Sequence, residues 1–104
     1  MPTKTETASC RHLDGITEPT PPQTLAGCEE CLKIGSGWVH LRLCLVCGHV
    51  GCCDSSPHRH ATKHFHHTNH AVIASFEPGE QWGWCYVHQE MLELPDRFLP
   101  LLRV

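Results

Sequence analysis

The stretch that decides the fold is residues 38–70, which read WVHLRLCLVCGHVGCCDSSPHRHATKHFHHTNH. It holds four of the chain's eight cysteines and eight of its ten histidines. Two spacings inside it are typical of metal ligands: the CxxC of Cys44 and Cys47, and the HxxxH of His60 and His64. A two-residue gap lets one tight turn aim two thiolates at the same ion. The stretch therefore predicts metal ligation.

Pairs of the same kind recur outside this stretch, as a CxH and a CxxC before it and a CxxH after it. Zinc takes four tetrahedral ligands from cysteine and histidine, so twelve ligands predict three closed zinc sites. The twelve predicted ligands are Cys10, His12, Cys28, Cys31, Cys44, Cys47, Cys52, His60, His64, His70, Cys85 and His88. Cys53 and five histidines are left over.

The alternative for so many cysteines is a disulfide framework. Residues 1–15 contain no apolar segment behind the positive residue, so we expect no secretory signal. We therefore expect a cytoplasmic chain, in which thiols stay reduced. Each cysteine group also has histidine at ligand spacing, which favours metal over disulfides.

Composition limits the other possibilities. The chain has 104 residues, of which 40% are apolar and 7% aromatic, so we expect one domain. Its core is small and needs a source of stability besides hydrophobic burial, such as cross-linking. A net charge of -3 with eight Lys and Arg argues against nucleic acid as a partner. The uncharged stretch at residues 43–53 is too short to span a bilayer, so no membrane role is expected.

Hydrophobic patterning predicts a few short elements. Near-alternation predicts a strand over residues 40–46, and AVIASF predicts another over residues 71–76. Residues 55–67 predict a helix that begins at a capping serine and a proline, with His60, His64 and His67 on one face. Turns are expected at residues 35–37 and 77–80. Residues 1–9 are expected to be a flexible arm, 14–24 an irregular loop, and 94–104 a tail with a short helical turn.

Taken in order, the ligand pairs resemble the UBP-type zinc finger, the zinc finger of ubiquitin-specific proteases and histone deacetylases. The family's CxH, CxxC, Trp, CxxC, Cys, HxxxH, His and WCxxC or WCxxH all occur between residue 10 and about residue 91. Trp38 stands seven residues past Cys31, and His70 stands six past His64, as in the family. The stretch looks most like the short stand-alone members found in bacteria.

The resemblance implies a small zinc-stabilised α+β domain over residues 10–93, built from a twisted antiparallel sheet with a packed helix. It also implies three interleaved ligand sets: Cys10, His12, Cys85 and His88; Cys28, Cys31, Cys52 and His60; and Cys44, Cys47, His64 and His70. Counting forward from Cys47 selects Cys52 as the ligand, whereas counting back from His60 selects Cys53. We prefer Cys52, because the loop toward His60 can absorb an insertion.

The family's tail-binding members take the free C-terminus of ubiquitin in an aromatic pocket, whose walls would map to Trp38, Trp84 and Tyr86. The chain departs from them at Asp54, where the family's arginine pairs with the tail's carboxylate. We therefore expect weak ubiquitin binding, with Arg42 or Arg59 as possible replacements for that arginine. Met91 stands where the family has a further pocket aromatic.

These observations predict a zinc-binding protein-interaction module that recognises a peptide or free C-terminal tail. The alternative is a metal-handling protein, in which surplus ligands exchange zinc, copper or nickel: Cys53, His58, His66 and His67. Catalysis is not expected, because closed zinc sites activate no water and the helix reads HATKH where a metalloprotease has HExxH.

Overall fold

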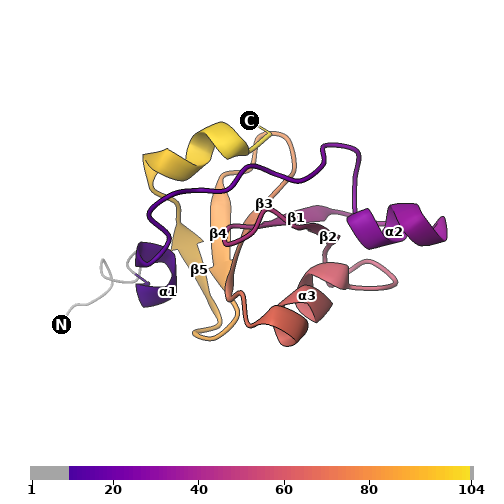
Figure 1. The fold of residues 1–104 in the computed structure, drawn as a ribbon, viewed down its shortest axis with the longest axis horizontal. Helices are drawn as coiled ribbons and strands as arrows, with labels where there is room; N and C mark the ends of the chain where they lie inside the picture. Colours follow the sequence, from indigo (N-terminus) through magenta and orange to yellow (C-terminus); the bar gives the residue numbers. More distant parts are fainter. Residues whose placement is uncertain (1–9, 104) are drawn as a thin grey trace.

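The computed structural model describes residues 10–103 (Figure 1). The predicted arm at residues 1–9 lies outside the described residues. The elements are α1 (Arg11–Asp14), α2 (Glu29–Ile34), β1 (Leu41–Cys44), β2 (Val50–Cys52), α3 (His60–Thr68), β3 (Val72–Ser75), β4 (Trp82–Cys85), β5 (Glu90–Glu93) and the 3₁₀ helix η2 (Asp96–Leu101). No helix among residues 10–103 is long and apolar enough to cross a membrane.

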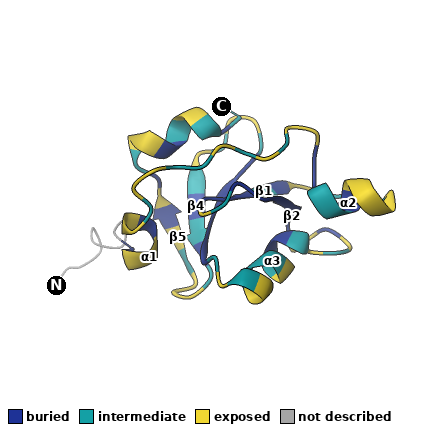
Figure 2. Ribbon diagram, in the orientation of Figure 1, coloured by how far each residue is buried: buried dark blue, intermediate teal, exposed yellow. Residues whose placement is uncertain are grey.

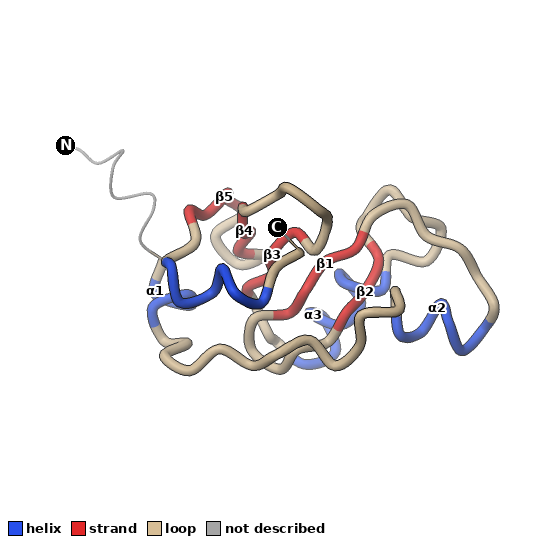
Figure 3. The backbone as a smooth tube through the Cα atoms, turned by 90° about the horizontal axis from the view of Figure 1, so that it is seen from above, coloured by secondary structure: helices blue, strands red, loops and turns tan. Residues whose placement is uncertain are grey.

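The strands form one antiparallel sheet in the order β2-β1-β3-β4-β5. Helix α3 packs on β1 and β2, α2 packs on β2, and α1 and α2 lie at opposite ends of the sheet (Figures 1 and 3). Residues 15–28 run irregularly along the sheet from α1 to α2. The prediction of an α+β domain with a twisted antiparallel sheet and a packed helix is confirmed.

The hydrophobic core lies around the central strands. Strand β3 is buried along its whole length, which fits its position in the middle of the sheet (Figure 2). Phe76 and Phe98 are the largest fully buried side chains, and they belong to one cluster that also contains Leu13 and Leu102. The C-terminal tail therefore folds back onto the domain through η2 and completes its core.

The predicted helix begins later than expected. The helix starts at His60, so Ser55 is too far from its first turn to cap it. Residues 53–56 form a turn instead, in which the Ser56 amide donates to the Cys53 carbonyl at 3.0 Å. The Ser56 hydroxyl accepts a hydrogen bond from the Val39 amide at 2.8 Å. Arg59 precedes the helix in the left-handed conformation, with φ of 48°. The His60 amide donates to the Cys52 sulfur at 3.1 Å. The sulfur of a predicted metal ligand thus accepts a hydrogen bond from an amide at the helix start, a role that the sequence analysis expected a serine to have.

Candidate metal centres and binding pocket

Three groups of four cysteine and histidine side chains gather within the described residues, and in each the ligand atoms lie within 4.8 Å of one another. We call them the terminal cluster (Cys10, His12, Cys85 and His88), the central cluster (Cys28, Cys31, Cys52 and His60) and the hairpin cluster (Cys44, Cys47, His64 and His70). These are the three ligand sets that the resemblance implies.

The terminal cluster joins the two ends of the domain. Cys10 and His12 flank the start of α1, while Cys85 ends β4 and His88 lies in the turn before β5. The Cys10 sulfur lies 3.3 Å from Nδ1 of His88, across 78 residues of sequence. Both cysteines are buried and both histidines are exposed, so this cluster opens to solvent on its histidine side.

The central cluster is built from one helix start, one strand end and another helix start. The Cys28 sulfur accepts the Cys31 amide at 3.4 Å and so caps α2, which ends at Gly35 in the left-handed conformation that glycine favours. Nδ1 of His60 lies 3.3 Å from the sulfurs of both Cys28 and Cys31. All three cysteines have no solvent exposure.

The hairpin cluster takes one thiol from the end of β1 and one from the turn that follows, and it takes one imidazole from the middle of α3 and one from just beyond its end. The Cys47 sulfur lies 3.3 Å from Nε2 of His64, and that nitrogen lies 3.3 Å from Nδ1 of His70. Asn69, in the left-handed conformation, ends the helix by donating to the Phe65 carbonyl at 2.7 Å. This reversal brings His70 back beside His64.

The geometry of all three clusters fits zinc. With Zn–S near 2.3 Å and Zn–N near 2.05 Å, the edges of a tetrahedral site measure roughly 3.3 to 3.8 Å. The shorter S···N, S···S and N···N separations within the clusters run from 3.3 Å to 3.9 Å, and all ligand atoms of a cluster lie within 4.8 Å of one another. Four protein ligands per cluster leave no open coordination position, as in structural zinc sites.

Burial keeps several of the ligand side chains neutral when no ion is bound. Burial raises the pKa of Cys28 to about 12 and that of Cys44 to about 11, and it also raises those of Cys31 and Cys85. Burial lowers the pKa of His64 to about 4, so its imidazole is neutral and keeps a lone pair at neutral pH. Buried thiolates need a cation beside them, and zinc supplies one.

The structure places Cys52, and not Cys53, in the central cluster, with its sulfur 3.5 Å from Nδ1 of His60. The Cys53 thiol lies 3.5 Å from the Ser56 hydroxyl instead. Burial would raise the Cys53 pKa, but hydrogen bonds from Ser56, Ser55 and the backbone, with the charge of Arg42, lower it overall.

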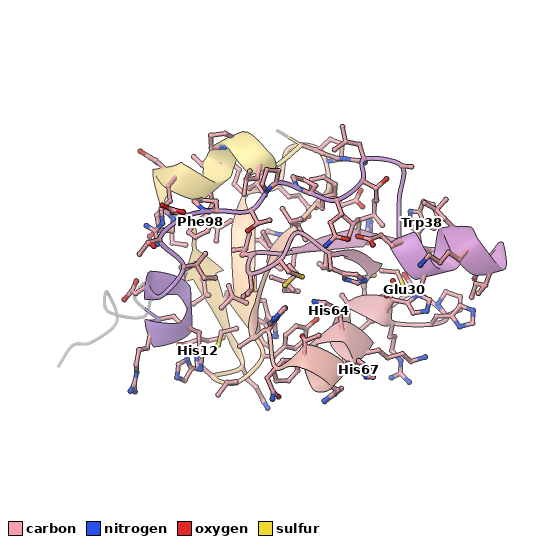
Figure 4. All side chains as sticks on the ribbon, in the orientation of Figure 1. His12, Glu30, Trp38, His64, His67 and Phe98 are labelled. Atoms are coloured by element: carbon pink, nitrogen blue, oxygen red, sulfur yellow. The ribbon has the colours of Figure 1, made fainter. Side chains whose placement is uncertain are left out.

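The surplus ligands proposed for metal handling do not gather. Within residues 10–103, Cys53, His58, His66 and His67 belong to no group of three ligand atoms. The His58 ring stacks on His60 at 5.4 Å. His67 is exposed and lies on the outer side of α3 (Figure 4), although the sequence placed it on one face with His60 and His64.

Sequence reasoning missed one polar contact that joins two clusters. His49 is buried, and its Nε2 lies 2.7 Å from a carboxylate oxygen of Glu30, while its ring stacks on that of His64 with the ring centres 4.1 Å apart. Burial would raise the Glu30 pKa, but hydrogen bonds from His49 and the backbone, with the charges of His49 and His60, together lower it. Glu29 accepts the Val50 amide at 3.0 Å. The two glutamates inside the CxxC were the available signal, since both attach α2 to the β1–β2 hairpin.

A pocket of about 240 Å³ opens on one face of the sheet, and we call it the sheet pocket. Its lining residues are His40, Arg42, Cys53, Asp54, Ser55, Ile73, Trp82, Trp84, Tyr86 and Met91. Cross-strand pairing of Ile73 with Trp84, and of Trp84 with Met91, aligns these three side chains on that face. The guanidinium of Arg42 lies over the Trp82 ring, 4.7 Å from its centre.

Two predicted pocket residues lie elsewhere. Trp38 is half-buried beside α2 and packs over Gly27, where a Cβ atom would stand 2.3 Å from its ring (Figure 4). Arg59 is exposed at the start of α3 and does not line the pocket. The sequence missed Trp82, although its i,i+2 spacing from Trp84 on a strand was a usable signal.

Comparisons with known proteins agree with these sites. A family model described as "Zn-finger in ubiquitin-hydrolases and other protein" matches residues 28–97. The BRCA1-associated proteins of Mus musculus and Homo sapiens are each 35% identical over 72 residues, covering 66% of this chain and 11% of each relative. A Rhodopseudomonas palustris protein solved by solution NMR is 62% identical, with a TM-score of 0.76, covering 85% of this chain and 84% of that one.

Proposed function

Because the chain belongs to the family of zinc fingers found in ubiquitin hydrolases and other proteins, we propose that it is a three-zinc binding module that takes the free carboxyl end of a peptide. The observation that supports a carboxylate as the bound group is the position of the Arg42 guanidinium over the Trp82 ring in the sheet pocket. The peptide end would lie against Trp84 and Tyr86.

The zinc ions have a structural role in this proposal. Zinc bound by the three clusters supplies folding free energy, of the order of 10 kcal/mol per site. The ligand side chains attach the segment at α1, and also α2 and α3, to the sheet that forms the pocket floor. Closed sites with four protein ligands offer no position for an activated water, so we propose binding without catalysis. Eight free thiols suit a reducing compartment, and we place the module in the cytoplasm.

Arg42 is positioned to read a carboxylate. Besides its contact with Trp82, it donates to the Leu41 carbonyl at 3.0 Å, and none of the ion pairs among residues 10–103 involves it. A planar guanidinium held against an indole keeps donors free for bidentate binding of a carboxylate. His40 adds a second nitrogen donor at the edge of the pocket.

Asp54 sets the preference among peptide ends. Its carboxylate lines the same pocket and repels a second carboxylate placed near it. Ubiquitin is therefore proposed as a weak ligand, and the partner is another protein or peptide C-terminus. The named relatives extend far beyond this chain, which covers 11% of their length, so their own activities are not carried over.

The test is a calorimetric comparison of N-acetylated pentapeptides that end in a free carboxylate or in an amide. We expect the free acids to bind and the amides to bind at least about tenfold more weakly, because a charge-assisted hydrogen bond is worth roughly 1.5 to 3 kcal/mol. Arg42→Gln should remove this difference, whereas Arg59→Gln, outside the pocket, should retain it. Equal binding of acid and amide to the natural protein would refute the proposal.

A further inference from the structure

A second pocket, of about 310 Å³, lies between α3 and the turn that joins β4 to β5, and we call it the helix pocket. Asp54, Trp84 and Tyr86 line both pockets, so the two share one wall. Phe65 and His66 of α3 form the other side of the helix pocket.

The helix pocket carries a negative charge. Asp54 is the only Asp, Glu, Lys or Arg among its lining residues. The carboxylate accepts a hydrogen bond from the Thr62 hydroxyl at 2.5 Å and takes part in no ion pair among residues 10–103. Arg42 lines the sheet pocket but not this one. The carboxylate is therefore held at the pocket wall by Thr62, and it makes no ion pair there with a described residue.

Aromatic rings stand beside that carboxylate. Phe65 and Tyr86 stack with their ring centres 4.7 Å apart and their planes 8° from parallel. The Tyr86 hydroxyl lies 3.4 Å from the Thr62 hydroxyl that binds Asp54, which ties the ring pair to the carboxylate. Ring faces and a carboxylate together attract ammonium and guanidinium groups.

We propose that the helix pocket binds a cationic side chain, the ammonium of lysine or the guanidinium of arginine, on the ligand whose carboxyl end occupies the sheet pocket. Asp54 has the ion-pairing role, and Phe65, Trp84 and Tyr86 form the aromatic wall. The inference rests on the proposed function only in joining the two groups in one ligand. The module then selects C-terminal segments with a basic residue close to the free carboxylate.

The first experiment tests the cation site without any carboxylate. Nα-acetyl-lysine N-methylamide and its norleucine counterpart differ only in the ammonium group, and both are titrated into zinc-loaded protein while amide and ring signals are followed by NMR. The lysine compound should shift signals of Phe65, Tyr86 and Asp54, and the norleucine compound should shift them little. Absence of lysine-specific shifts at these residues would overturn the inference, whatever the free-carboxylate peptides do.

The second experiment measures the preference within a peptide. N-acetylated Gly/Ser pentapeptides carry one lysine at each of the three positions before the C-terminal residue, and each has a norleucine partner. The best lysine peptide should bind about three- to tenfold more tightly than its partner. Equal affinity of every lysine peptide and its partner would contradict the inference.

The variant that isolates the charge is Asp54→Asn, because asparagine still accepts the Thr62 hydrogen bond. It should abolish the lysine preference, whereas Asp96→Asn, an exposed acid on η2, should keep it. If the natural protein prefers lysine peptides but binds free acids and amides equally, the proposed function alone is wrong. A lysine preference that survives in Asp54→Asn would defeat the cation site alone.

Discussion

The central and terminal clusters have the same number of ligands but different surroundings. The central cluster contains three fully buried thiols, and its histidine begins α3. The terminal cluster has two thiols and two exposed histidines, and it connects segments more than 70 residues apart. The difference indicates that the central cluster organises the interior around the β1–β2 hairpin, whereas the terminal cluster attaches α1 to the β4–β5 side of the sheet.

Ligand removal should separate these roles most strongly. Cys28→Ser should abolish cooperative unfolding, because losing a site worth roughly 10 kcal/mol exceeds or matches the stability of a typical domain. His88→Ala should leave a protein that unfolds cooperatively at a lower temperature, since its lost ligand is exposed. Calorimetry and far-UV circular dichroism measure both. If both variants lost cooperative unfolding, or both kept it, the two clusters would not have different structural roles.

The zinc affinity of the central cluster should depend more steeply on pH than that of the terminal cluster. Burial raises the pKa values of Cys28 and Cys31 in the central cluster and of Cys85 in the terminal cluster, so these thiols are protonated at neutral pH without metal and release protons when zinc binds. Zinc affinity therefore rises with pH and falls on acidification. It should rise more steeply at the central cluster, which has three thiols against two.

Site-resolved NMR in a competing chelator gives the two slopes from the His60 and His88 rings. It is run between about pH 7.5 and 8.5, where imidazoles are ordinarily neutral and the protons released come from thiols. The central slope should exceed the terminal one by about one proton per zinc. A terminal slope equal to or steeper than the central one would contradict the assignment of ligands.

The contact between the central and hairpin clusters should have a smaller effect. His49→Gln removes the ring that stacks on His64 and weakens the hydrogen bond to Glu30. We expect a loss of about 1 kcal/mol in unfolding free energy, limited because Glu30 is partly exposed. Chemical denaturation of the zinc-loaded protein measures it, and an unchanged midpoint would show that the two clusters do not depend on this contact.

The smallest effect is expected at a histidine outside every cluster. His67 is exposed on the outer side of α3, so His67→Ala should change the unfolding free energy by no more than about 0.5 kcal/mol. Denaturation under the same conditions checks it, with the zinc content as control. A zinc ion lost with His67 would mean that the surplus histidines do hold metal.

The sequence predicted what local spacing determines. The CxxC turns, the HxxxH helix and the strands β1 and β3 follow from such spacing, and the family resemblance supplied the interleaving of the ligand sets. Prediction from the sequence failed where a distant group takes the hydrogen bond expected of a local one. At the start of α3, the Cys52 sulfur accepts the amide hydrogen bond that a serine was expected to accept. Prediction from the sequence also misplaced Trp38, because the close approach of Gly27 is a tertiary contact. The burial of His49 against Glu30 likewise depends on how α2 meets the hairpin.

We propose that three closed zinc sites hold this binding module together. Native mass spectrometry of the purified protein tests it most directly, combined with circular dichroism after chelation. The account predicts the 11.7 kDa chain with three zinc ions and eight reduced cysteines, and unfolding when the zinc is removed. A folded chain that carries one zinc ion, or four disulfides and no zinc, would contradict it.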